Sequence, residues 1–370
     1  MIPLIVDLET EWRGGQNQAL LLLKGLYERG HAAELLAPPG SALAHRARKE
    51  GYYVHYASRG LFRLPAAVKI RNLLSTGRID LVHANEAHAV SAAWLACAHW
   101  SVPFLASRRV GYPIGKNWFS QAKYRAASRI LANSQWVADQ AAASGVPIDK
   151  LRVVYEGTEI PERFSPAQRK QARRRWGVPE HAPLLGCVGV LLPDKGQEWL
   201  IRAVAELCKD YPDVRLLLAG DGPCRADLES LANELGVTQA VIFAGFVKDV
   251  ESAYAALDVF LLPSFFEALN NSLLAAMAYE IPSIAFRRGA LTEIIEDGHS
   301  GLIVSGPDVP EIRAAVKRIL QDRAFALALG RSARHRVAEN FSADRMIEKT
   351  LQVYEEVLSK RGFATVKPAA

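Results

Sequence analysis

The chain has 370 residues, which is too long for one compact core, so at least two domains are expected. Half of its residues are hydrophobic and 23% are charged, which is typical of a globular protein and excludes an intrinsically disordered one. The sequence contains no run of about 18 apolar residues, and its acidic start lacks the basic region of a signal peptide. We therefore expect a cytoplasmic protein without a membrane span.

Positive charge is concentrated in the first half of the chain. Residues 1–165 contain 20 Lys and Arg and 13 Asp and Glu, a net charge of 20 − 13 = +7. The remainder contains 45 − 20 = 25 basic and 39 − 13 = 26 acidic residues, a net charge of −1. This asymmetry fits an anionic acceptor or surface on one side of the protein, and it fits the solvated faces of a basic protein equally well. The four scattered cysteines have no metal-ligand spacing, which fits a reducing compartment.

Short β-rich runs alternate with longer helical runs through the first half. The pattern opens with the strand Pro3–Leu8, a turn containing Gly14 and Gly15, the helix Gln16–Arg29 and the strand Ala32–Ala37. Helices are also expected over residues 43–50, 65–76 and 89–100, and strands over 52–56, 81–83, 102–106, 130–134 and 151–155. Such alternation predicts a parallel sheet whose ligands bind beyond the carboxyl ends of its strands. The residues expected at that edge are Glu11, His83, Asn85, Glu86, His88, Arg108 and Arg109.

Several features of this half have two readings. The stretch from Tyr112 to Arg129 mixes cations with aromatic residues, which suits a membrane surface or a glycolipid acceptor, or an ordinary helix with its aromatics inward. His88 is expected to be a packing histidine, whereas His83 could be either a packing or a ligand-binding residue. A basic helix over Arg163–Trp176 has no accompanying nucleic-acid motif and predicts a solvated connector.

The second half repeats the alternation. Strands are expected over residues 184–190, 214–219, 241–243, 258–263 and 281–286, and helices over 199–210, 225–235, 311–322 and 325–340. The strand 258–263 delivers a loop with one carboxylate, Glu267, which is followed by Asn270, Asn271 and a helix that opens at Ser272. The N–H groups of a helix start suit phosphates and sugar hydroxyls, and a carboxylate accepts hydrogen bonds from sugar hydroxyls.

The order of residues from Pro263 to Gly301 resembles the donor site of the retaining GT-B glycosyltransferases, family 4. The matching positions are Pro263, Ser264, Glu267, Ala276, Met277, Ala278, Pro282, Gly289, Glu293, Asp297, Gly298 and Gly301. The resemblance covers nearly the whole chain and implies an α/β protein with two Rossmann-like domains that face each other across a cleft. It implies an acceptor-side domain over residues 1–165, a nucleotide-sugar donor domain over 166–342, and a closing helix over 343–361 that crosses back to the first domain. Residues 362–370 are expected to be a frayed tail.

The resemblance also implies the chemistry of the site. It implies transfer of a sugar from a nucleoside-diphosphate sugar with retention, without a metal ion or another cofactor. Lys195 is assigned to the diphosphate and Glu267 to the hydroxyls of the donor sugar. Arg109 stands where many family members have a His near the reacting carbon, and it is expected to take part in catalysis by binding the diphosphate or an anionic acceptor, unless Arg108 and Arg109 only form local salt bridges. The residues expected to bind the donor are Gly14, Gly15, Gly189, Lys195, Gly220, Phe246, Glu267, Asn270, Asn271 and Ser272.

The sequence departs from the family pattern at positions that matter for catalysis. Ala275 stands where the family has a second Glu that holds the ribose, Val190 stands for an Arg, and Arg109 stands for a His. Two further departures, Ala268 and Glu280, replace Gly. These changes leave a degenerate, non-catalytic protein that binds a nucleotide or a partner as an alternative to an active transferase.

The acceptor is open at this point. A lipid-linked or lipopolysaccharide-core sugar at the inner face of the inner membrane fits the basic first half, and a soluble small acceptor fits if the basic residues are scattered. A nucleotide-sugar epimerase would need an acid–base set that the sequence does not display, and no nucleic-acid partner is expected.

Overall fold

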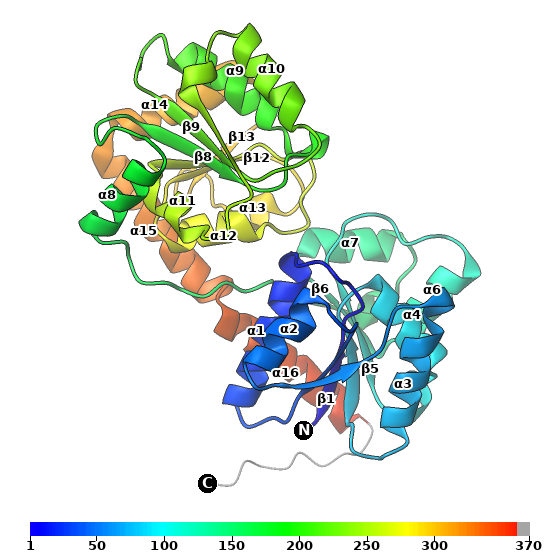
Figure 1. The fold of residues 1–370 in the computed structure, drawn as a ribbon. Coiled ribbons are helices and arrows are strands. Elements are labelled where there is room, and N and C mark those ends of the chain that lie inside the picture. The colour runs from blue at the N-terminus through cyan, green and yellow to red at the C-terminus, as the bar shows by residue number, and fades with distance from the viewer. Residues whose placement is uncertain (361–370) are drawn as a thin grey trace. The chain divides into compact units, whose positions relative to one another are not determined.

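The computed structural model describes residues 1–360. The predicted tail, residues 362–370, and the last residue of the predicted helix 343–361 lie outside the described residues. The chain divides into two compact units (Figure 1). Unit 1 contains Met1–Gly157 together with the segment that begins at Ala343, and unit 2 contains Thr158–Ser342. The division between the units thus follows Gly157, whereas the sequence placed the domain boundary after residue 165.

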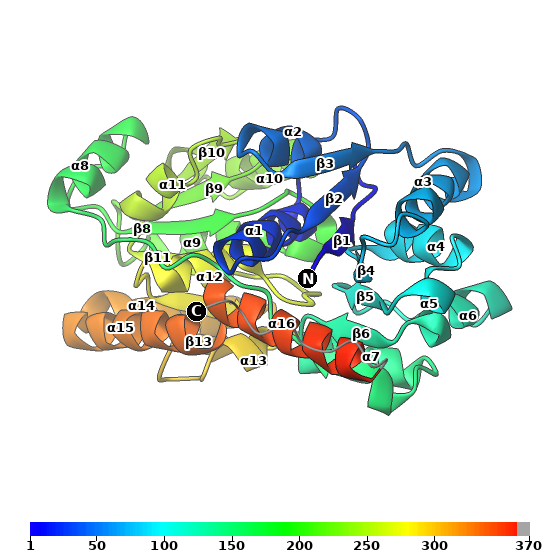
Figure 2. The same cartoon turned by 90° about the horizontal axis from the view of Figure 1, so that it is seen from below.

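Unit 1 is built on a seven-stranded sheet in the order β3-β2-β1-β4-β5-β6-β7, and all of its strand pairs are parallel (Figure 2). The strands are β1 (Pro3–Val6), β2 (Glu34–Ala37), β3 (Tyr53–Tyr56), β4 (Leu81–Ala84), β5 (Phe104–Arg108), β6 (Arg129–Ala132) and β7 (Leu151–Val153). The interior strand β1 pairs with both β2 and β4, so that Ile5 lies between Leu35 and His83. This architecture confirms the parallel α/β sheet that the alternation predicts.

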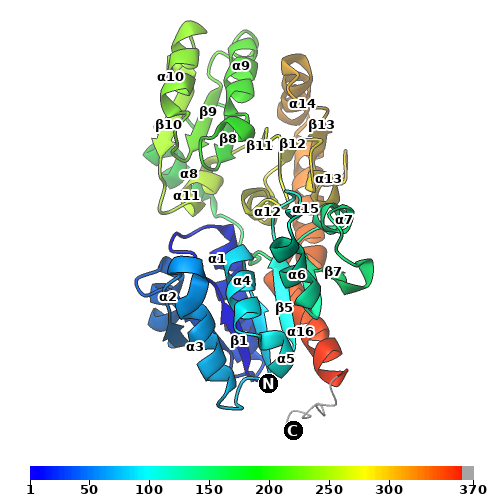
Figure 3. The same ribbon diagram turned by 90° about the vertical axis from the view of Figure 1, so that its right-hand side faces the viewer.

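The helices of unit 1 cover both faces of its sheet. They are α1 (Gly14–Glu28), α2 (Ala42–Lys49), η1 (Leu61–Arg63), α3 (Leu64–Leu74), α4 (Ala87–Leu95), α5 (Ala98–Ser101), α6 (Trp118–Ala126), α7 (Gln135–Ala143), η2 (Ile148–Lys150) and α16 (Ala343–Ser359). One core cluster includes buried residues of α3, α4 and α6, and the other includes buried residues of α1, α2 and α16. In Figure 3, α3, α4 and α6 lie together on one side of the unit.

Two helix predictions in unit 1 are wrong in detail. The helix expected from Gln16 begins at Gly14, because Gln16 caps the helix start by accepting the Arg13 backbone N–H at 3.2 Å. Gly14 and Gly15 are therefore the first helical residues and not a turn before the helix. The single helix expected over 89–100 is two helices, because Cys97 adopts a left-handed φ of 56° that ends α4.

The last described helix, α16, belongs to unit 1. Tyr354 is fully buried, and its hydroxyl lies 2.6 Å from His83 Nδ1 on β4. A Cβ added to Gly25 of α1 would lie 2.1 Å from Ile347 Cδ1, so the two helices touch where α1 has no side chain. Glu356 pairs with Arg129 of β6 at 2.5 Å and with Arg152 of β7 at 2.7 Å.

Unit 2 contains a second parallel sheet, with six strands in the order β10-β9-β8-β11-β12-β13. The strands are β8 (Leu184–Val188), β9 (Arg215–Ala219), β10 (Val241–Gly245), β11 (Val259–Leu262), β12 (Ser283–Phe286) and β13 (Leu302–Val304). The helices are α8 (Pro166–Arg175), η3 (Pro193–Lys195), α9 (Gln197–Leu207), α10 (Arg225–Glu234), η4 (Thr238–Ala240), α11 (Glu251–Ala256), α12 (Asn271–Ala278), α13 (Leu291–Ile294), α14 (Val309–Gln321) and α15 (Arg323–Asn340). Among the described residues, no helix is both long enough and apolar enough to cross a membrane.

The sequence predicted that the basic helix α8 is solvated, but the structure shows that some of its cations are paired with unit 2. Arg173 is 3% exposed, and its guanidinium lies 3.2 Å from the carboxylate of Asp258, just before β11. Arg169 pairs with the same carboxylate at 2.5 Å. The cations on this side of α8 therefore fasten the helix to the sheet of unit 2.

Candidate active site

Three loops of unit 2 meet beyond the carboxyl ends of β8, β11 and β12. The loop after β8 carries Lys195, and the loop after β11 carries Glu267. The backbone N–H of Phe265 donates to the carbonyl of Asp194 at 2.9 Å, and that of Ala290 donates to the carbonyl of Glu267 at 3.0 Å. The three loops are therefore joined through their backbones into one surface at the edge of the sheet.

Two glycines permit these close approaches. Gly196 has a φ of 66°, and a Cβ there would lie 2.3 Å from the carbonyl oxygen of Pro263. Gly289 has a φ of 52°, and its Cβ would lie 2.1 Å from the carbonyl oxygen of Glu267. Any other residue would strain its backbone and push the loops apart. These positions thus set the place of Glu267 relative to the loop that carries Lys195.

Lys195 and Glu267 form the polar centre of this surface. Lys195 Nζ lies 2.8 Å from Glu267 Oε1, and Asn270 Nδ2 donates to the same oxygen at 3.0 Å. Glu267 is 7% exposed, whereas the Lys195 side chain is 25% exposed. The cation expected on the diphosphate and the carboxylate expected on the sugar therefore lie within one hydrogen-bonded cluster.

Asn270 connects this cluster to the start of α12. Its Oδ1 accepts the backbone N–H of Leu273 at 2.8 Å and the hydroxyl of Ser272 at 2.9 Å, so Asn270 is the residue that caps the helix. The helix thus begins at Asn271, one residue before the predicted start. The positive end of the α12 dipole lies beside Glu267 and Lys195, which is an arrangement that favours an anionic ligand.

The remaining predicted donor residues of unit 2 follow the neighbouring strands. The N–H of Gly189, after β8, donates to the carbonyl of Ala219 at 3.0 Å, and a Cβ on Gly220 would lie 1.8 Å from the carbonyl oxygen of Gly189. Phe246 follows β10 and is 79% exposed. Since the sheet is parallel, all these residues lie along the same edge as Lys195 and Glu267.

Two carboxylates near the missing second Glu lie on other parts of the chain than α12. Ala275 lies within α12, and Glu280 lies beyond the opposite end of that helix from Asn270. Glu280 Oε1 is 2.6 Å from Arg163 Nη2, so this carboxylate is engaged in an ion pair away from the helix start. Glu293 lies on the separate helix α13.

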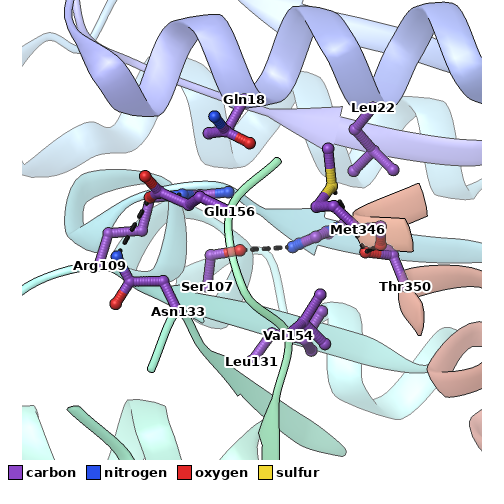
Figure 4. A pocket seen from close by; sticks show the side chains of 11 residues that line it. Gln18, Leu22, Ser107, Arg109, Leu131, Asn133, Val154, Glu156, Met346 and Thr350 are labelled. Carbon is purple, nitrogen blue, oxygen red and sulfur yellow. Dashed lines mark hydrogen bonds and ion pairs between the residues drawn. The ribbon is translucent and has the colours of Figure 1, made fainter. Parts of the chain in front are cut away.

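In unit 1, Arg109 lies within a buried polar network. Its Nη1 donates to the carbonyl of Asn85 at 2.5 Å, and its Nε lies 3.1 Å from Glu156 Oε1. Burial lowers the pKa of Arg109, and the Glu156 carboxylate opposes this shift. The side chain lines a cavity of about 20 Å³, which is enough for one water molecule. Figure 4 shows Arg109 among the other lining residues, which include Glu156, Asn133 and Gln18.

Gly14 and Gly15 lie next to this network. Asn85 Nδ2 donates to the carbonyl of Gly15 at 3.0 Å and to Asp7 Oδ2 at 2.6 Å. Burial raises the pKa of Asp7, against the hydrogen bonds that stabilise its charged form. The first turn of α1, Asn85 and Arg109 are thus held together at the carboxyl edge of β1, β4 and β5.

The two histidines of this edge have different environments. His83 is 2% exposed, and its ring nitrogens lie 2.6 Å from the hydroxyl of Tyr354 and 2.7 Å from that of Ser107. Burial lowers its pKa to about 3, so His83 is a neutral packing histidine. His88 is half-buried, and its Nδ1 lies 2.8 Å from Arg63 Nη2. The sequence gave no sign of this Arg63 contact, because the two residues belong to different elements.

Within the described residues, one group has the donor atoms for a metal ion, namely Glu9, Glu86 and His88 of unit 1. The positive charges of Arg59, Arg63 and Lys123 act on His88, so a metal ion there would meet three like charges. The group therefore does not alter the prediction of a metal-independent site.

Both halves of the chain match known families of sugar-transferring enzymes. Residues 182–322 match the family described as "Glycosyl transferases group 1", and residues 12–160 match "Glycosyltransferase Family 4". A 2-deoxystreptamine glucosyltransferase of Streptomyces kanamyceticus is 35% identical over 53% of this chain and 51% of its own length. A D-inositol 3-phosphate glycosyltransferase of Stackebrandtia nassauensis is 30% identical over 95% of this chain and 88% of its own length. A GDP-mannose-dependent phosphatidylinositol monomannoside mannosyltransferase of Mycolicibacterium smegmatis is 28% identical over 89% and 91%, respectively.

Solved structures share the fold of the whole chain. A glycosyltransferase from Rickettsia africae superposes with a TM-score of 0.86 at 21% identity, over 96% of this chain and 98% of its own. Anabaena HepE in complex with UDP-glucose gives 0.81 at 22% identity over 97% and 100%. A lipopolysaccharide outer core galactosyltransferase in its apo form gives 0.71 at 16% over 96% and 99%. The predicted GT-B fold is thereby confirmed.

Three findings point to the same family: the two family matches, the Stackebrandtia nassauensis relative that is aligned over most of both proteins, and the two Rossmann-like units. The chain therefore belongs to the group 1 glycosyl transferases and is an enzyme that transfers sugars.

Proposed function

We propose that this protein is a retaining glycosyltransferase whose nucleoside-diphosphate sugar binds at the carboxyl edge of the unit 2 sheet. The observation that carries the proposal is the cluster of Lys195, Glu267 and Asn270 at the start of α12. A cation, a helix start and a nearly buried carboxylate are the groups that a diphosphate and a sugar require.

In the proposed reaction, Lys195 leaves Glu267 and pairs with the diphosphate. Its charge and the N–H groups at Asn271 and Ser272 stabilise the diphosphate as the bond to the anomeric carbon breaks. Glu267 accepts hydrogen bonds from hydroxyls of the donor sugar and fixes its orientation. The acceptor oxygen bonds to the anomeric carbon on the face that the diphosphate leaves, and the acceptor proton passes to a diphosphate oxygen. Lys195 and the helix dipole supply the positive charge, so we propose that no metal ion is needed.

Arg109 is assigned to the acceptor side. Because Glu156 and Asn85 hold its guanidinium, we propose that it positions the first turn of α1 at the carboxyl edge of unit 1. The neighbouring Gly14 and Gly15 then allow a ligand to approach the backbone closely.

A cell-envelope glycan or glycolipid, such as the lipopolysaccharide core, is the proposed acceptor. The support is a set of exposed apolar side chains and of basic side chains on and just before η1 and at the starts of α3 and α6 in unit 1. Its apolar members are Leu61, Phe62, Leu64, Trp118 and Phe119, and its basic members are Arg59, Arg63, Lys116 and Lys123. Such a set of side chains suits peripheral attachment to an anionic membrane, and the mannosyltransferase relative named above acts on a phosphatidylinositol monomannoside.

The test of the proposed function is a calorimetric screen of UDP, GDP, ADP and their sugars. One nucleotide that binds clearly, together with slow hydrolysis of its sugar, is the expected result, and UDP comes first because it accompanies a structural neighbour. Binding of a nucleotide without hydrolysis or transfer would favour the degenerate alternative. Salt-sensitive binding to vesicles that contain phosphatidylglycerol tests membrane attachment separately.

A further inference from the structure

A cluster of cations lies next to the carboxyl edge of the unit 1 sheet, outside the polar network around Arg109. Arg63 of η1 donates from Nη2 to His88 Nδ1 at 2.8 Å, and Lys123 of α6 lies 3.0 Å from the hydroxyl of Ser91 on α4. The charge of Arg59 also acts on His88. Two chain segments that are far apart in sequence, one with Arg59 and Arg63 and the other with Lys123, therefore bring positive charge to the first turns of α4.

These cations are poorly neutralised by their surroundings. Burial and the charges of Arg59, Arg63 and Lys123 lower the pKa of His88 to about 4, so its ring is neutral at pH 7. Burial raises the pKa of Glu86 to about 7, so this carboxyl is only partly ionised there. Glu9 Oε1 is 3.7 Å from His88 Nε2 and is the remaining carboxylate of the group. Three basic side chains, Arg59, Arg63 and Lys123, thus face two carboxylates, Glu9 and Glu86.

The hydrogen bonds at His88 leave a donor directed away from Arg63. Because a guanidinium can only donate, Nδ1 of the neutral ring accepts and Nε2 carries the proton. Glu86 accepts the backbone N–H of Ala89 at 2.6 Å and caps α4, which holds His88 in the first turn of the helix. The cluster therefore offers a guanidinium and an ammonium, which are donors that bind a phosphate group, while the imidazole N–H lies 3.7 Å from Glu9 Oε1 and would have to turn from that carboxylate to the phosphate.

The turn that supplies Arg63 is held in an unusual conformation. Phe62 and Arg63 have φ values of 51° and 63°, a left-handed geometry that non-glycine side chains rarely adopt. The same turn leaves Phe62 65% exposed while it directs Arg63 toward His88. This backbone conformation thus exposes the side chain of Phe62 to solvent and directs the side chain of Arg63 into the cluster.

We propose that Arg63, Lys123, Arg59 and His88 form a binding site for a phosphate group carried by the acceptor. The site lies in unit 1, and Lys195 and Glu267 of unit 2 take no part in it. Its assignment to the acceptor rests on the proposed transferase activity, whereas binding of the anion does not. The phosphate can belong to a soluble acceptor or to a lipid headgroup, and the test separates these two sources.

The experiment uses the full chain and measures the affinity for inorganic phosphate by calorimetry at low salt. Arg63→Gln and Lys123→Gln are each expected to weaken binding about tenfold or more, because each removes a charge-assisted hydrogen bond. Lys49→Gln, on the exposed end of α2, removes the same charge elsewhere in unit 1 and is expected to leave binding unchanged. Lys195→Ala is expected to remove only the phosphate bound at the donor site, so phosphate binding that persists in this variant and is weakened by Arg63→Gln or Lys123→Gln belongs to the proposed site.

A second arm uses phosphatidylcholine vesicles with and without phosphatidylglycerol. Soluble phosphate bound through Arg63 and Lys123 supports a free phosphorylated acceptor, and binding through them to the anionic vesicles alone supports a lipid headgroup. The proposal is overturned if neither probe depends on Arg63 and Lys123, if only Lys195→Ala removes phosphate binding, or if Lys49→Gln weakens binding equally. Lys123→Gln tests the site even if Arg63→Gln disturbs its strained turn. Failure of the donor screen would contradict the proposed function and leave this result unaffected.

Discussion

Glu267 and Lys195 are 72 positions apart in the chain, and their charged groups lie 2.8 Å apart. The pair stabilises a carboxylate that is 7% exposed, because an uncompensated charge at that depth would be costly. A diphosphate that attracts Lys195 would release Glu267 to accept hydroxyl hydrogen bonds. Lys195 would then pair with the diphosphate, and Glu267 would keep hydrogen bonds from Asn270 and from the sugar hydroxyls in place of its ion pair.

Glu267→Ala is expected to lower kcat for sugar transfer by about a hundredfold or more, because the donor sugar loses the acceptor that orients it. The melting temperature should change little, since the neighbouring backbone bonds do not involve this side chain. Steady-state kinetics and thermal melting measure the two effects. Glu206→Ala, which removes a carboxylate from the exposed surface of α9, is the control. A variant rate within a few-fold of wild type would show that Glu267 does not orient the sugar.

Ala275→Glu is expected to tighten binding of the nucleoside diphosphate about tenfold. The position is one helical turn after Asn271 on α12, so a Glu there can reach toward the ligand at the helix start. A charge-assisted hydrogen bond to a ribose hydroxyl is worth about 1.5–3 kcal/mol. Calorimetry measures the change, and Ala275→Gln, which lacks the charge, should give a smaller gain. Equal affinities for all three proteins would place the ribose away from α12.

At the scale of elements, the site depends on loops that are held together by backbone contacts. The loops after β8, β11 and β12 carry the ligand-binding side chains, and the glycines at 196 and 289 allow carbonyl oxygens to lie against them. The strands determine where each loop starts, and the backbone contacts at Gly196 and Gly289 determine the path that the loops follow from there. A residue that touches no ligand can therefore move Glu267.

Gly289→Ala tests this dependence. A Cβ would lie 2.1 Å from the carbonyl oxygen of Glu267 and would also strain a φ of 52°, so we expect nucleotide-sugar turnover to fall at least about tenfold. Gly236→Ala is the matched control, because it has a φ of 68° and no heavy atom within 4 Å of the added carbon. Because both glycines have a positive φ, the two variants should lose similar amounts in melting temperature. Only Gly289→Ala should also lose turnover in the kinetic assay. Equal turnover would contradict the role of the close contact.

The attachment of α8 gives a prediction on stability. Arg173→Ala should lower the free energy of unfolding by about 3 kcal/mol, because it breaks a buried pair with Asp258 and leaves carbonyl oxygens of the same region without their donor. Arg174→Ala, at the exposed neighbouring position, should change it by less than about 0.5 kcal/mol. Chemical denaturation measures the free energy of unfolding of both variants. Similar losses in the two variants would support the solvated connector helix that the sequence predicts.

At the scale of the whole molecule, unit 2 is continuous in sequence and unit 1 is not. The core of unit 1 contains Val353, Tyr354 and Val357 of α16, which pack in one cluster with Leu22 and Leu23 of α1. Unit 1 therefore lacks part of its core until the last helix has been made. Unit 2 has a core cluster drawn from its own strands and helices.

Ending the chain after Ser342 should accordingly destabilise unit 1 and leave unit 2 folded. We expect unit 1 to lose its cooperative unfolding transition, because the apolar surface under α16 becomes exposed, while unit 2 keeps its transition and its affinity for the nucleotide. Differential scanning calorimetry and nucleotide titration measure these properties, with a chain that ends at Lys360 as the control. Loss of both transitions would mean that the units do not fold independently.

The sequence by itself determined the parallel α/β class and most helices and strands, because alternating apolar runs are a local pattern. The resemblance to a family, and not a local pattern, named Lys195, Glu267 and Asn270 as residues of the proposed donor site. The ends of elements were less predictable, since the break at Cys97 and the start of α1 depend on single backbone conformations and capping contacts.

The tertiary structure alone decided which distant residues meet. It paired Lys195 with Glu267, buried Arg173 against Asp258, joined His83 to Tyr354, and placed Arg63 and Lys123 around the first turns of α4. In the sequence, Arg173 belongs to a helix predicted to be solvated and His83 is an isolated histidine, because spacing along a chain does not specify contacts across a sheet. Burial also lowers the pKa of His83 and of Lys123, which no local pattern encodes.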